Sequence, residues 1–320
     1  MRLRQAIHDF ISNLKLNERE RDNAIRQHTY LRDGLAMRLE LDPRFNTFLT
    51  GSYARSTAIR PLKDIDVFCV MKRTEAFNPL IQTPTDALRA VKVALDTHYP
   101  GKAAEPQNRS VNIAFTESGI AYDIVPAFAD EGRDDEVFFI PDIQASRWIR
   151  SNPRAHMARS VEANAAADSE LKPLTKAVKH WNRRRPDGER LRSFHIEVMI
   201  WSALQAPPES RLDGLLSIFD GLALQVLHQT PDPARLGPDI DGDMTLAQKT
   251  AAADRFKGVA STLRDAKKQA EDGKTEAAHH LMYGLFGDPY PEKGKAAPSV
   301  TVGAPAIVHS APDGQKSRFG

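Results

Sequence analysis

The chain of 320 residues has a single cysteine, only 7% aromatic residues and almost no excess of either charge, with 44 Lys and Arg against 42 Asp and Glu. One cysteine excludes an internal disulfide, which fits a protein of the reducing cytoplasm, where we expect this chain to act. No run approaches the roughly 18 apolar residues of a membrane-spanning helix, and residues 1–8 lack the apolar stretch of a secretory signal. We therefore expect no membrane association. The net charge of +2 gives no general attraction to nucleic acid, so we expect none as an obligatory partner.

The pattern of apolar residues changes along the chain. Over the first ~140 residues helical and strand-like segments alternate, which favours an α/β or α+β sheet domain. We predict helices over 1–42 and 85–98, and strands over 45–49, 65–71, 111–115 and 120–126. Past Pro141 strand signals disappear, and helical spacing predicts helices over 170–184, 193–204, 212–227 and 246–268.

These changes divide the chain into three parts. We predict a sheet domain over residues 1–145, which includes an N-terminal helix, and a helical domain over 146–290. Residues 291–320 are rich in Pro, Gly, Lys and Ala, which predicts a flexible tail.

Two aspartates, Asp64 and Asp66, stand one residue apart in an apolar strand that follows a Gly51-Ser52 turn. Alternate side chains of a strand share a face, so both carboxylates point the same way. Such a pair is costly in apolar surroundings unless a cation lies between the carboxylates, and Mg²⁺ prefers these oxygen ligands. Asp123 is a third acidic residue on a predicted strand. The alternative is structural: a plain hairpin turn, and aspartates that solvate a strand end.

Taken together, Gly51-Ser52, Asp64-Ile65-Asp66 and Asp123 resemble the defining pattern of the DNA polymerase β-like nucleotidyltransferase superfamily. The resemblance implies an α+β fold, with a mixed sheet flanked by helices and a C-terminal helical bundle as a second lobe. It implies that the three aspartates are catalytic and bind two Mg²⁺, with Mn²⁺ as a possible substitute ion. Gly51 and Ser52 would hold the phosphates of a nucleoside triphosphate (NTP).

The helical half resembles a narrower group. Its segments 171–182 and 192–197 are similar to the lysine helix and Ser-aromatic element of oligoadenylate synthetases, cyclic GMP-AMP synthase and the bacterial cGAS/DncV-like nucleotidyltransferases. The resemblance implies that Lys179, with Lys176 beside it, contacts the triphosphate. It implies that Ser193 binds a phosphate oxygen and that Phe194 stacks on the base. The alternative is a solvated lysine face and a buried Phe.

A basic cluster follows the lysine helix, at Arg183, Arg184 and Arg185 with Arg190 and Arg192. Such a cluster binds phosphates in some proteins, but it has no interleaved aromatic residues. We interpret it as a solvated helix end or loop.

The bacterial resemblance implies a synthase that joins NTPs, ATP among them, into a cyclic di- or trinucleotide for anti-phage (CBASS) signalling. A downstream effector would bind the product, and regulatory proteins would act on the tail, whose last residue Gly320 would be the point of conjugation. The main alternative is a templateless enzyme that adds nucleotides to RNA or makes oligoadenylate. Transfer of AMP to a protein and a non-catalytic nucleotide sensor are further alternatives.

Overall fold

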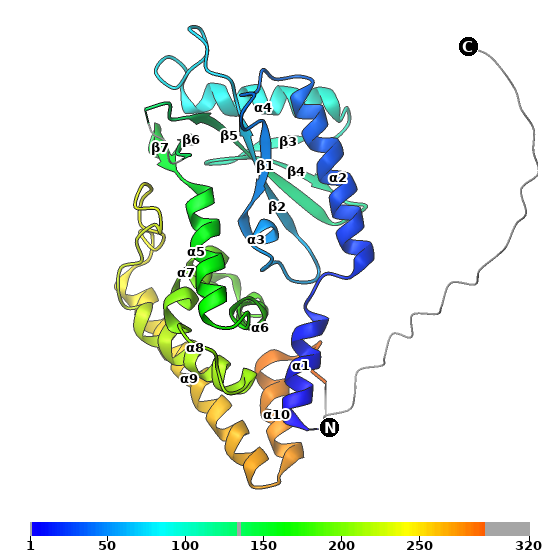
Figure 1. Cartoon of the computed structure of the whole chain (residues 1–320), viewed down its shortest axis with the longest axis vertical. Helices are drawn as coiled ribbons and strands as arrows, with labels where there is room; N and C mark the ends of the chain where they lie inside the picture. Colours follow the sequence, from blue (N-terminus) through cyan, green and yellow to red (C-terminus); the bar gives the residue numbers. More distant parts are fainter. Residues whose placement is uncertain (1, 133–135, 292–320) are drawn as a thin grey trace, which may run out of the picture.

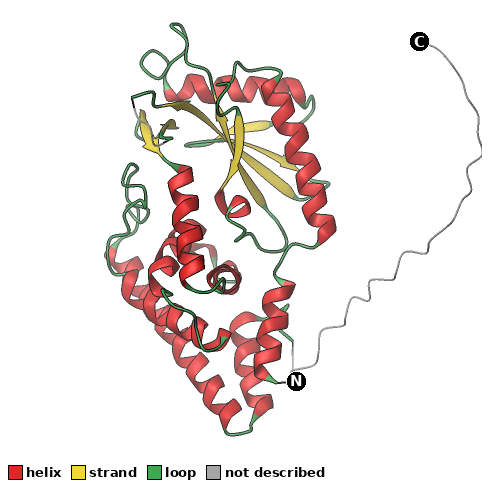
Figure 2. Ribbon diagram, viewed as in Figure 1, coloured by secondary structure: helices red, strands yellow, loops and turns green. Residues whose placement is uncertain are grey.

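In the computed structural model, which describes residues 2–132 and 136–291, a β-sheet with two long helices stands beside a group of helices (Figures 1 and 2). The strands are β1 (Thr47–Thr50), β2 (Asp64–Val70), β3 (Ala104–Pro106), β4 (Val111–Phe115), β5 (Ile120–Ala129), β6 (Phe138–Asp142) and β7 (Arg147–Ser151). The helices are α1 (Leu3–Asn13), α2 (Glu18–Ala36), α3 (Gly51–Ala54), α4 (Pro84–His98), α5 (Pro153–Ala166), α6 (Leu171–Arg183), α7 (Ser193–Ala203), α8 (Arg211–Gln225), α9 (Leu246–Glu271) and α10 (Thr275–Phe286), with a short 3₁₀ helix at Asp187–Glu189. The predicted α+β class, with a mixed sheet, flanking helices and C-terminal helices, is confirmed.

The sheet is mixed. Its main order is β1-β2-β5-β4-β3, and β6 extends β5 and pairs with β7. Only β2 and β5 run parallel, while the other pairs are antiparallel. The parallel pair lies at the centre of the sheet, and its register decides which side chains of the two strands stand together.

The two faces of the sheet bury different side chains. Ile65, Val67 and Cys69 of β2 join an apolar cluster with α2 and α4, which cover that face (Figure 1). Phe68 and Val70 belong to a second cluster on the opposite face. Asp64 and Asp66 precede Phe68 on that opposite face, as the alternation along β2 predicts.

Local signals fix where the two covering helices begin. Asn17 is the N-cap of α2: its side chain accepts a hydrogen bond from Glu20 N, and the Glu20 side chain completes a capping box. Thr83 and Asp86 form the same motif at the start of α4, and Pro84 occupies the first turn. The predicted helix over 1–42 is two helices, because residues 14–17 separate α1 from α2.

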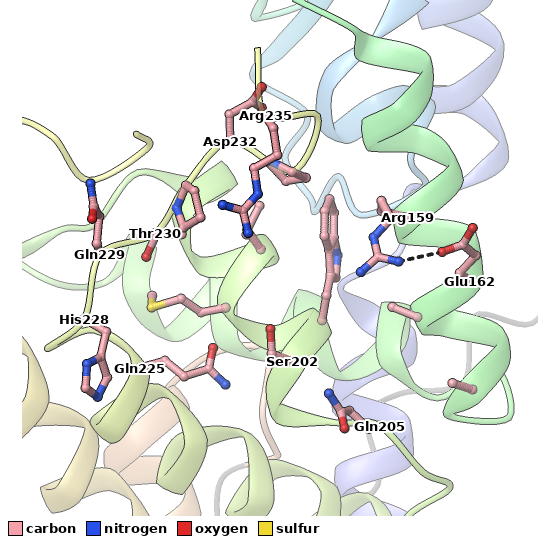
Figure 3. A pocket seen from close by; sticks show the side chains of 17 residues that line it. Arg159, Glu162, Ser202, Gln205, Gln225, His228, Gln229, Thr230, Asp232 and Arg235 are labelled. Carbon is pink, nitrogen blue, oxygen red and sulfur yellow. Dashed lines mark hydrogen bonds and ion pairs between the residues drawn. The ribbon is translucent and has the colours of Figure 1, made fainter. Parts of the chain in front are cut away.

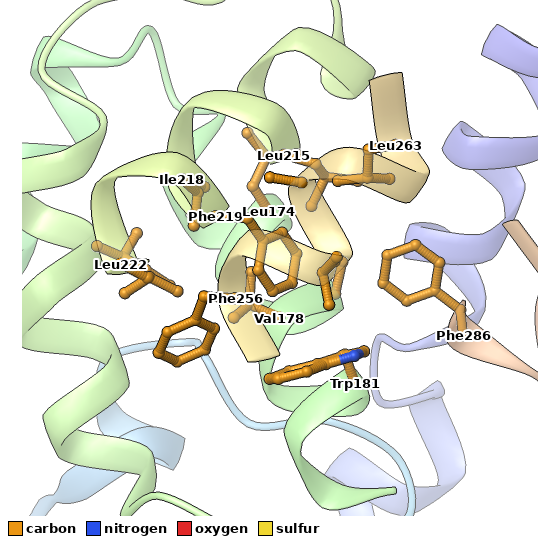
Figure 4. Packing of buried hydrophobic residues seen from close by; sticks show 14 of the residues in the cluster. Leu174, Val178, Trp181, Leu215, Ile218, Phe219, Leu222, Phe256, Leu263 and Phe286 are labelled. Carbon is orange, nitrogen blue, oxygen red and sulfur yellow. The ribbon is translucent and has the colours of Figure 1, made fainter. Parts of the chain in front are cut away.

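Helix α1 packs with the C-terminal helices and not with the sheet. Ile7 and Phe10 lie in the same core as Trp181 of α6 and Phe219 of α8. Figure 4 shows the centre of this core, where the Trp181 ring meets Phe219 edge-on at 5.3 Å between centroids. The N-terminal segment therefore joins the two lobes, whereas the boundary near residue 145 stays a prediction.

Several elements were not predicted from the sequence, among them β3, β6, β7 and α5. Strand β6 extends to Asp142 and β7 follows it, so the absence of strands past Pro141 is wrong. Only Ile149 of β7 is buried, and such a polar strand carries no apolar signal. Helix α5 buries only Pro153 and Ser160, so it lacks an apolar stripe.

No helix within residues 2–132 and 136–291 is long and apolar enough to cross a membrane. The predicted tail, apart from Pro291, lies outside the described residues, as does Gly320.

Candidate functional site

Two of the predicted catalytic carboxylates are neighbours across the parallel pair of strands. Asp66 of β2 is in register with Asp123 of β5, and Asp64 is in register with Ala121. Asp64 is exposed, whereas Asp66 and Asp123 are half-buried. Asn112 donates a hydrogen bond to Asp123 Oδ1 at 2.9 Å, which fixes that carboxylate from the next strand. The fold thus brings acidic groups from separate parts of the sequence to one place.

The clustering changes how these carboxyl groups ionise. Burial, and then the negative charges of Asp64 and Asp123, raise the pKa of Asp66 to about 6. Burial also raises the pKa of Asp123, and Asp64 adds to that effect. Like charges held together in a half-buried place are stabilised by a cation. The donor set therefore fits a hard divalent ion such as Mg²⁺.

Gly51 brings the backbone against one of these carboxylates. A Cβ at this position would lie 1.6 Å from Asp66 Oδ2, so no side chain fits without moving Asp66. Gly51 has φ +66°, a left-handed conformation that glycine adopts without strain. It starts the single-turn helix α3, so the predicted turn is helical over Gly51–Ala54.

The three carboxylates do not form a preassembled metal site. Within residues 2–132 and 136–291, no three Asp, Glu, His or Cys side chains are placed to hold a metal ion. In this arrangement Asp66 lies against Gly51, and Asp123 accepts a hydrogen bond from Asn112. Metal binding by Asp64, Asp66 and Asp123 therefore stays a prediction.

A cavity of about 410 Å³ opens beside the carboxylates and is lined from both lobes. Seven predicted site residues line it: Gly51, Ser52, Asp64, Asp66, Lys179, Ser193 and Phe194. Asp123 and Lys176 are not among its lining residues. The remaining walls include Arg55, Lys63, Arg109, Ser151, His156, Arg183 and Glu197, which gives the cavity several cationic side chains.

A larger cavity of about 950 Å³ lies on the helical lobe, lined by α5, α7 and the segment after α8 (Figure 3). None of the predicted site residues lines it. Its two acidic groups are already paired, Glu162 with Arg159 at 3.0 Å and Asp232 with His156 at 2.6 Å. We therefore place the candidate active site in the smaller cavity.

The two predicted lysines have different surroundings. Lys179 is buried, lines the cavity and forms an ion pair with Glu197 at 2.8 Å between Nζ and Oε1. Lys176 is half-buried outside the lining, and burial, together with the charges of Lys15, Lys179 and Lys172, lowers its pKa to about 8. Only Lys179 of the two lines the cavity, and the contact of both lysines with the triphosphate stays a prediction.

Ser193 and Phe194 begin α7 at the mouth of the cavity. Ser193 is exposed and Phe194 half-buried, so neither is a plain core residue. The Phe194 ring contacts the Arg55 guanidinium, at 4.9 Å from its carbon to the ring centroid, and the His156 ring at 5.1 Å between centroids. The aromatic ring predicted to stack on a base is thus set between two polar side chains.

Only the first member of the basic cluster lines the cavity. Arg183 Nη1 donates to Pro61 O at 3.1 Å, and burial lowers its pKa while Asp64 acts to raise it. Arg185 instead lies over the Trp181 ring. The interpretation of the whole cluster as a solvated helix end is therefore wrong for Arg183.

Arg55, His156 and Glu197 were missed in the sequence. Arg55 stands four residues after Gly51, and a cation so near the glycine-serine turn is a local signal in the sequence. Glu197 follows Phe194 closely, but two of its three partners, Thr57 and Arg55, are 140 and 142 residues away in the chain. A single sequence does not show such a pairing.

A mixed sheet that aligns carboxylates beside a cation-lined cavity, with a helical lobe closing that cavity, defines the class of nucleotidyltransferases. Residues 1–164 match the family model of the SMODS domain, described as Second Messenger Oligonucleotide or Dinucleotide Synthetase domain. The chain belongs to this family, within the cGAS/DncV-like nucleotidyltransferases. It is an enzyme of nucleotidyl transfer that acts on nucleotide substrates, and its function is the synthesis of a cyclic oligonucleotide second messenger.

Two curated relatives span almost the whole chain. The cyclic AMP-AMP-AMP synthase of Acinetobacter sp. (strain ATCC 27244 / 9458) is 27% identical over 333 residues, which cover 97% of this chain and 92% of the relative. The cyclic AMP-AMP-GMP synthase of Enterobacter hormaechei subsp. hoffmannii (strain UCI 50) is 22% identical over 365 residues, which cover 92% and 93%.

Solved structures show the same fold. CdnC of Escherichia coli MS115-1, solved with ATP, matches with a TM-score of 0.73 and 19% identity over 90% of this chain and 98% of that one. The complex of the same protein with HORMA-deltaN gives a TM-score of 0.72, 19% identity and the same coverage.

Proposed function

We propose that the chain joins ATP, alone or with a second NTP, into a cyclic trinucleotide, and that Asp64, Asp66 and Asp123 are its catalytic carboxylates. The observation that carries the proposal is the side-by-side register of Asp66 and Asp123 next to a cation-lined cavity. The products in the names of these two relatives contain three nucleotides, at least two of them AMP, which supports ATP as a substrate.

Asp64, Asp66 and Asp123 would hold divalent ions, either Mg²⁺ or Mn²⁺. When bound, such ions stabilise the attacking and leaving oxygens of an in-line displacement at phosphorus. Asp123, held by Asn112, orients the attacking ribose hydroxyl. The aspartates thus serve as ligands and as the groups that align this hydroxyl with the α-phosphorus of the next nucleotide.

The remaining cavity residues bind the substrate. Gly51 and Ser52 offer backbone N–H groups and a hydroxyl to the phosphates, since no side chain at position 51 blocks their approach. Lys179 neutralises the triphosphate charge, and Ser193 bonds a phosphate oxygen. The ring of Phe194 stacks on the base.

The experiment is incubation of purified protein with labelled ATP and GTP, Mg²⁺ and no RNA, followed by phosphatase treatment and mass spectrometry. We expect a phosphatase-resistant cyclic product that contains AMP, and no such product from Asp66→Asn. Extension of added RNA, with no cyclic product, would contradict the proposal and support the RNA-adding alternative.

Partner proteins form a further part of the proposal. The HORMA complex of the structural neighbour supports regulation by a bound protein, and the product would activate an effector in anti-phage (CBASS) defence. The test is co-expression with proteins encoded beside the gene and measurement of product yield. A yield unchanged by all of them would argue against regulation of this kind.

A further inference from the structure

A fully buried carboxylate on α7 bonds three side chains at the inner wall of the cavity. Glu197 Oε1 accepts hydrogen bonds from Lys179 Nζ at 2.8 Å and from Thr57 Oγ1 at 2.9 Å. Its Oε2 accepts one from Arg55 Nε at 2.9 Å. Glu197 has 0% exposure and the other three at most 5%, so water does not screen these contacts. We call these four residues the Glu197 network.

The network joins the helical lobe to the predicted phosphate loop. Arg55 and Thr57 follow Gly51 closely, and their backbone N–H groups donate to Gly51 O at 3.1 Å and to Ser52 O at 2.9 Å. The side chains of the same two residues donate hydrogen bonds to Glu197 of α7. One carboxylate therefore holds the loop that carries Gly51 and Ser52 against the helical lobe.

The network contains one anion and two cations. Although burial opposes ionisation, the charges of Lys179 and Arg55 hold the pKa of Glu197 below its usual value. One positive charge is left over at the cavity wall. The same two cations act to lower the pKa of Asp66, so they lie close to the catalytic carboxylates as well.

Both cations keep donors for a ligand. Lys179 has three N–H donors, of which Glu197 takes one. Arg55 bonds Glu197 through Nε, which leaves its terminal nitrogens, and its guanidinium lies over the Phe194 ring. Both side chains line the cavity. Glu197 thus fixes both side chains, while their other N–H donors stay available to a ligand in the cavity.

We propose that Glu197 is a positioning residue for the triphosphate. It fixes Lys179 and Arg55 beside Gly51 and Ser52, so that both cations meet the phosphates of a bound NTP in one arrangement. This inference rests on the proposed function of the cavity as the NTP site.

The test compares Glu197→Gln, Lys179→Met and the double variant by ATP dissociation constant, with fluorescent ATP and Mg²⁺, and by melting temperature. We expect Glu197→Gln to weaken ATP binding about tenfold or more, the scale of a lost charge-assisted hydrogen bond. In the double variant the net charge of the network returns to +1. Its melting temperature should recover relative to Glu197→Gln, while its ATP binding stays close to that of Lys179→Met.

A purely structural role predicts the opposite, because ATP affinity would then follow melting temperature in all three variants. The matched control is Glu162→Gln, an exposed acid of α5, which should bind ATP as the wild type does. If Glu197→Gln does not fold, Thr57→Val removes one donor to Glu197 and keeps the side-chain shape. We expect it to weaken ATP binding by about threefold, because one of the three hydrogen bonds that hold the carboxylate is lost while those from Lys179 and Arg55 stay.

The two proposals fail in different ways. If the wild type binds ATP no better than Asp66→Asn does, and makes no cyclic product, both the proposed function and this inference are wrong. If the wild type binds ATP and makes the product, and Glu197→Gln and Thr57→Val have the same ATP affinity as the wild type, only the positioning role is wrong.

Discussion

The carboxylate of Asp66 lies against the backbone of Gly51, at a distance that leaves no room for a Cβ. The contact joins the phosphate loop to the central strand of the sheet. Since Gly51 also has a left-handed backbone, two independent constraints act on this one position.

Gly51→Ala should therefore abolish synthesis of the cyclic product. The added methyl group displaces Asp66, and the left-handed backbone costs about 1–2 kcal/mol with alanine. We expect a loss of about 100-fold or more in rate, as for removal of one aligned electrostatic group. Product formation and melting temperature measure the two effects separately.

Gly119→Ala is the matched control for this substitution. Gly119 has φ +68°, but a Cβ there would meet nothing within 4 Å. It should show the same backbone strain and keep its activity. If Gly51→Ala and Gly119→Ala were equally active, the contact with Asp66 would have no role in catalysis.

The raised pKa of Asp66 predicts a pH-dependent stability difference. The folded protein holds this proton more tightly than the unfolded chain, because the pKa rises from 3.8 to about 6. Ionisation therefore costs stability as pH rises through this interval, and the cost stays constant above it. Asp66→Asn avoids the cost, so it should gain at most about 3 kcal/mol over the wild type by pH 7.

Denaturant unfolding of both proteins from pH 4 to pH 8 measures this difference. The control is Asp254→Asn, which changes an exposed aspartate of α9. A difference between wild type and Asp66→Asn that does not change with pH would show that Asp66 titrates normally.

The same pKa predicts how metal binding depends on pH. A cation displaces the proton from Asp66, so the affinity for Mn²⁺ should fall about tenfold for each pH unit below 6. Above pH 7 the affinity should level off. Calorimetric titration of the nucleotide-free protein with Mn²⁺ tests this, and an affinity independent of pH would remove Asp66 as a ligand.

The two lysines of α6 should differ in their effect on ATP binding. Lys179→Ala should weaken ATP binding by about tenfold, because it removes a buried cation from the cavity wall. Lys176→Ala should change it by less than about threefold, since Lys176 acts there only at a distance. Equal losses in the two variants would support the expectation that both contact the triphosphate.

Several parts of this site could be predicted from the sequence because their signals are local. On any strand, the alternation of Asp64, Ile65 and Asp66 places the two aspartates on the same face. The glycine-serine turn precedes this strand in the sequence. The alignment of Asp66 with Asp123 needed the family resemblance, since strand register depends on the whole sheet.

Other parts depend on distant contacts. In the sequence, Glu197 is one acidic residue in an apolar helix. The structure shows that Arg55 and Lys179 form ion pairs with it. Arg183 is the last residue of α6, and only the folded structure shows that its side chain lines the cavity. Strand β7 is defined by its pairing with β6, and its composition does not distinguish it from a loop.

The most direct test of the central claim is a crystal structure with a non-hydrolysable ATP analogue and Mn²⁺, with the ions located by anomalous scattering. We predict Mn²⁺ bound by Asp64, Asp66 and Asp123, with the triphosphate over Gly51 and Ser52. Mn²⁺ sites away from these three carboxylates, or the analogue bound in another cavity, would contradict the account.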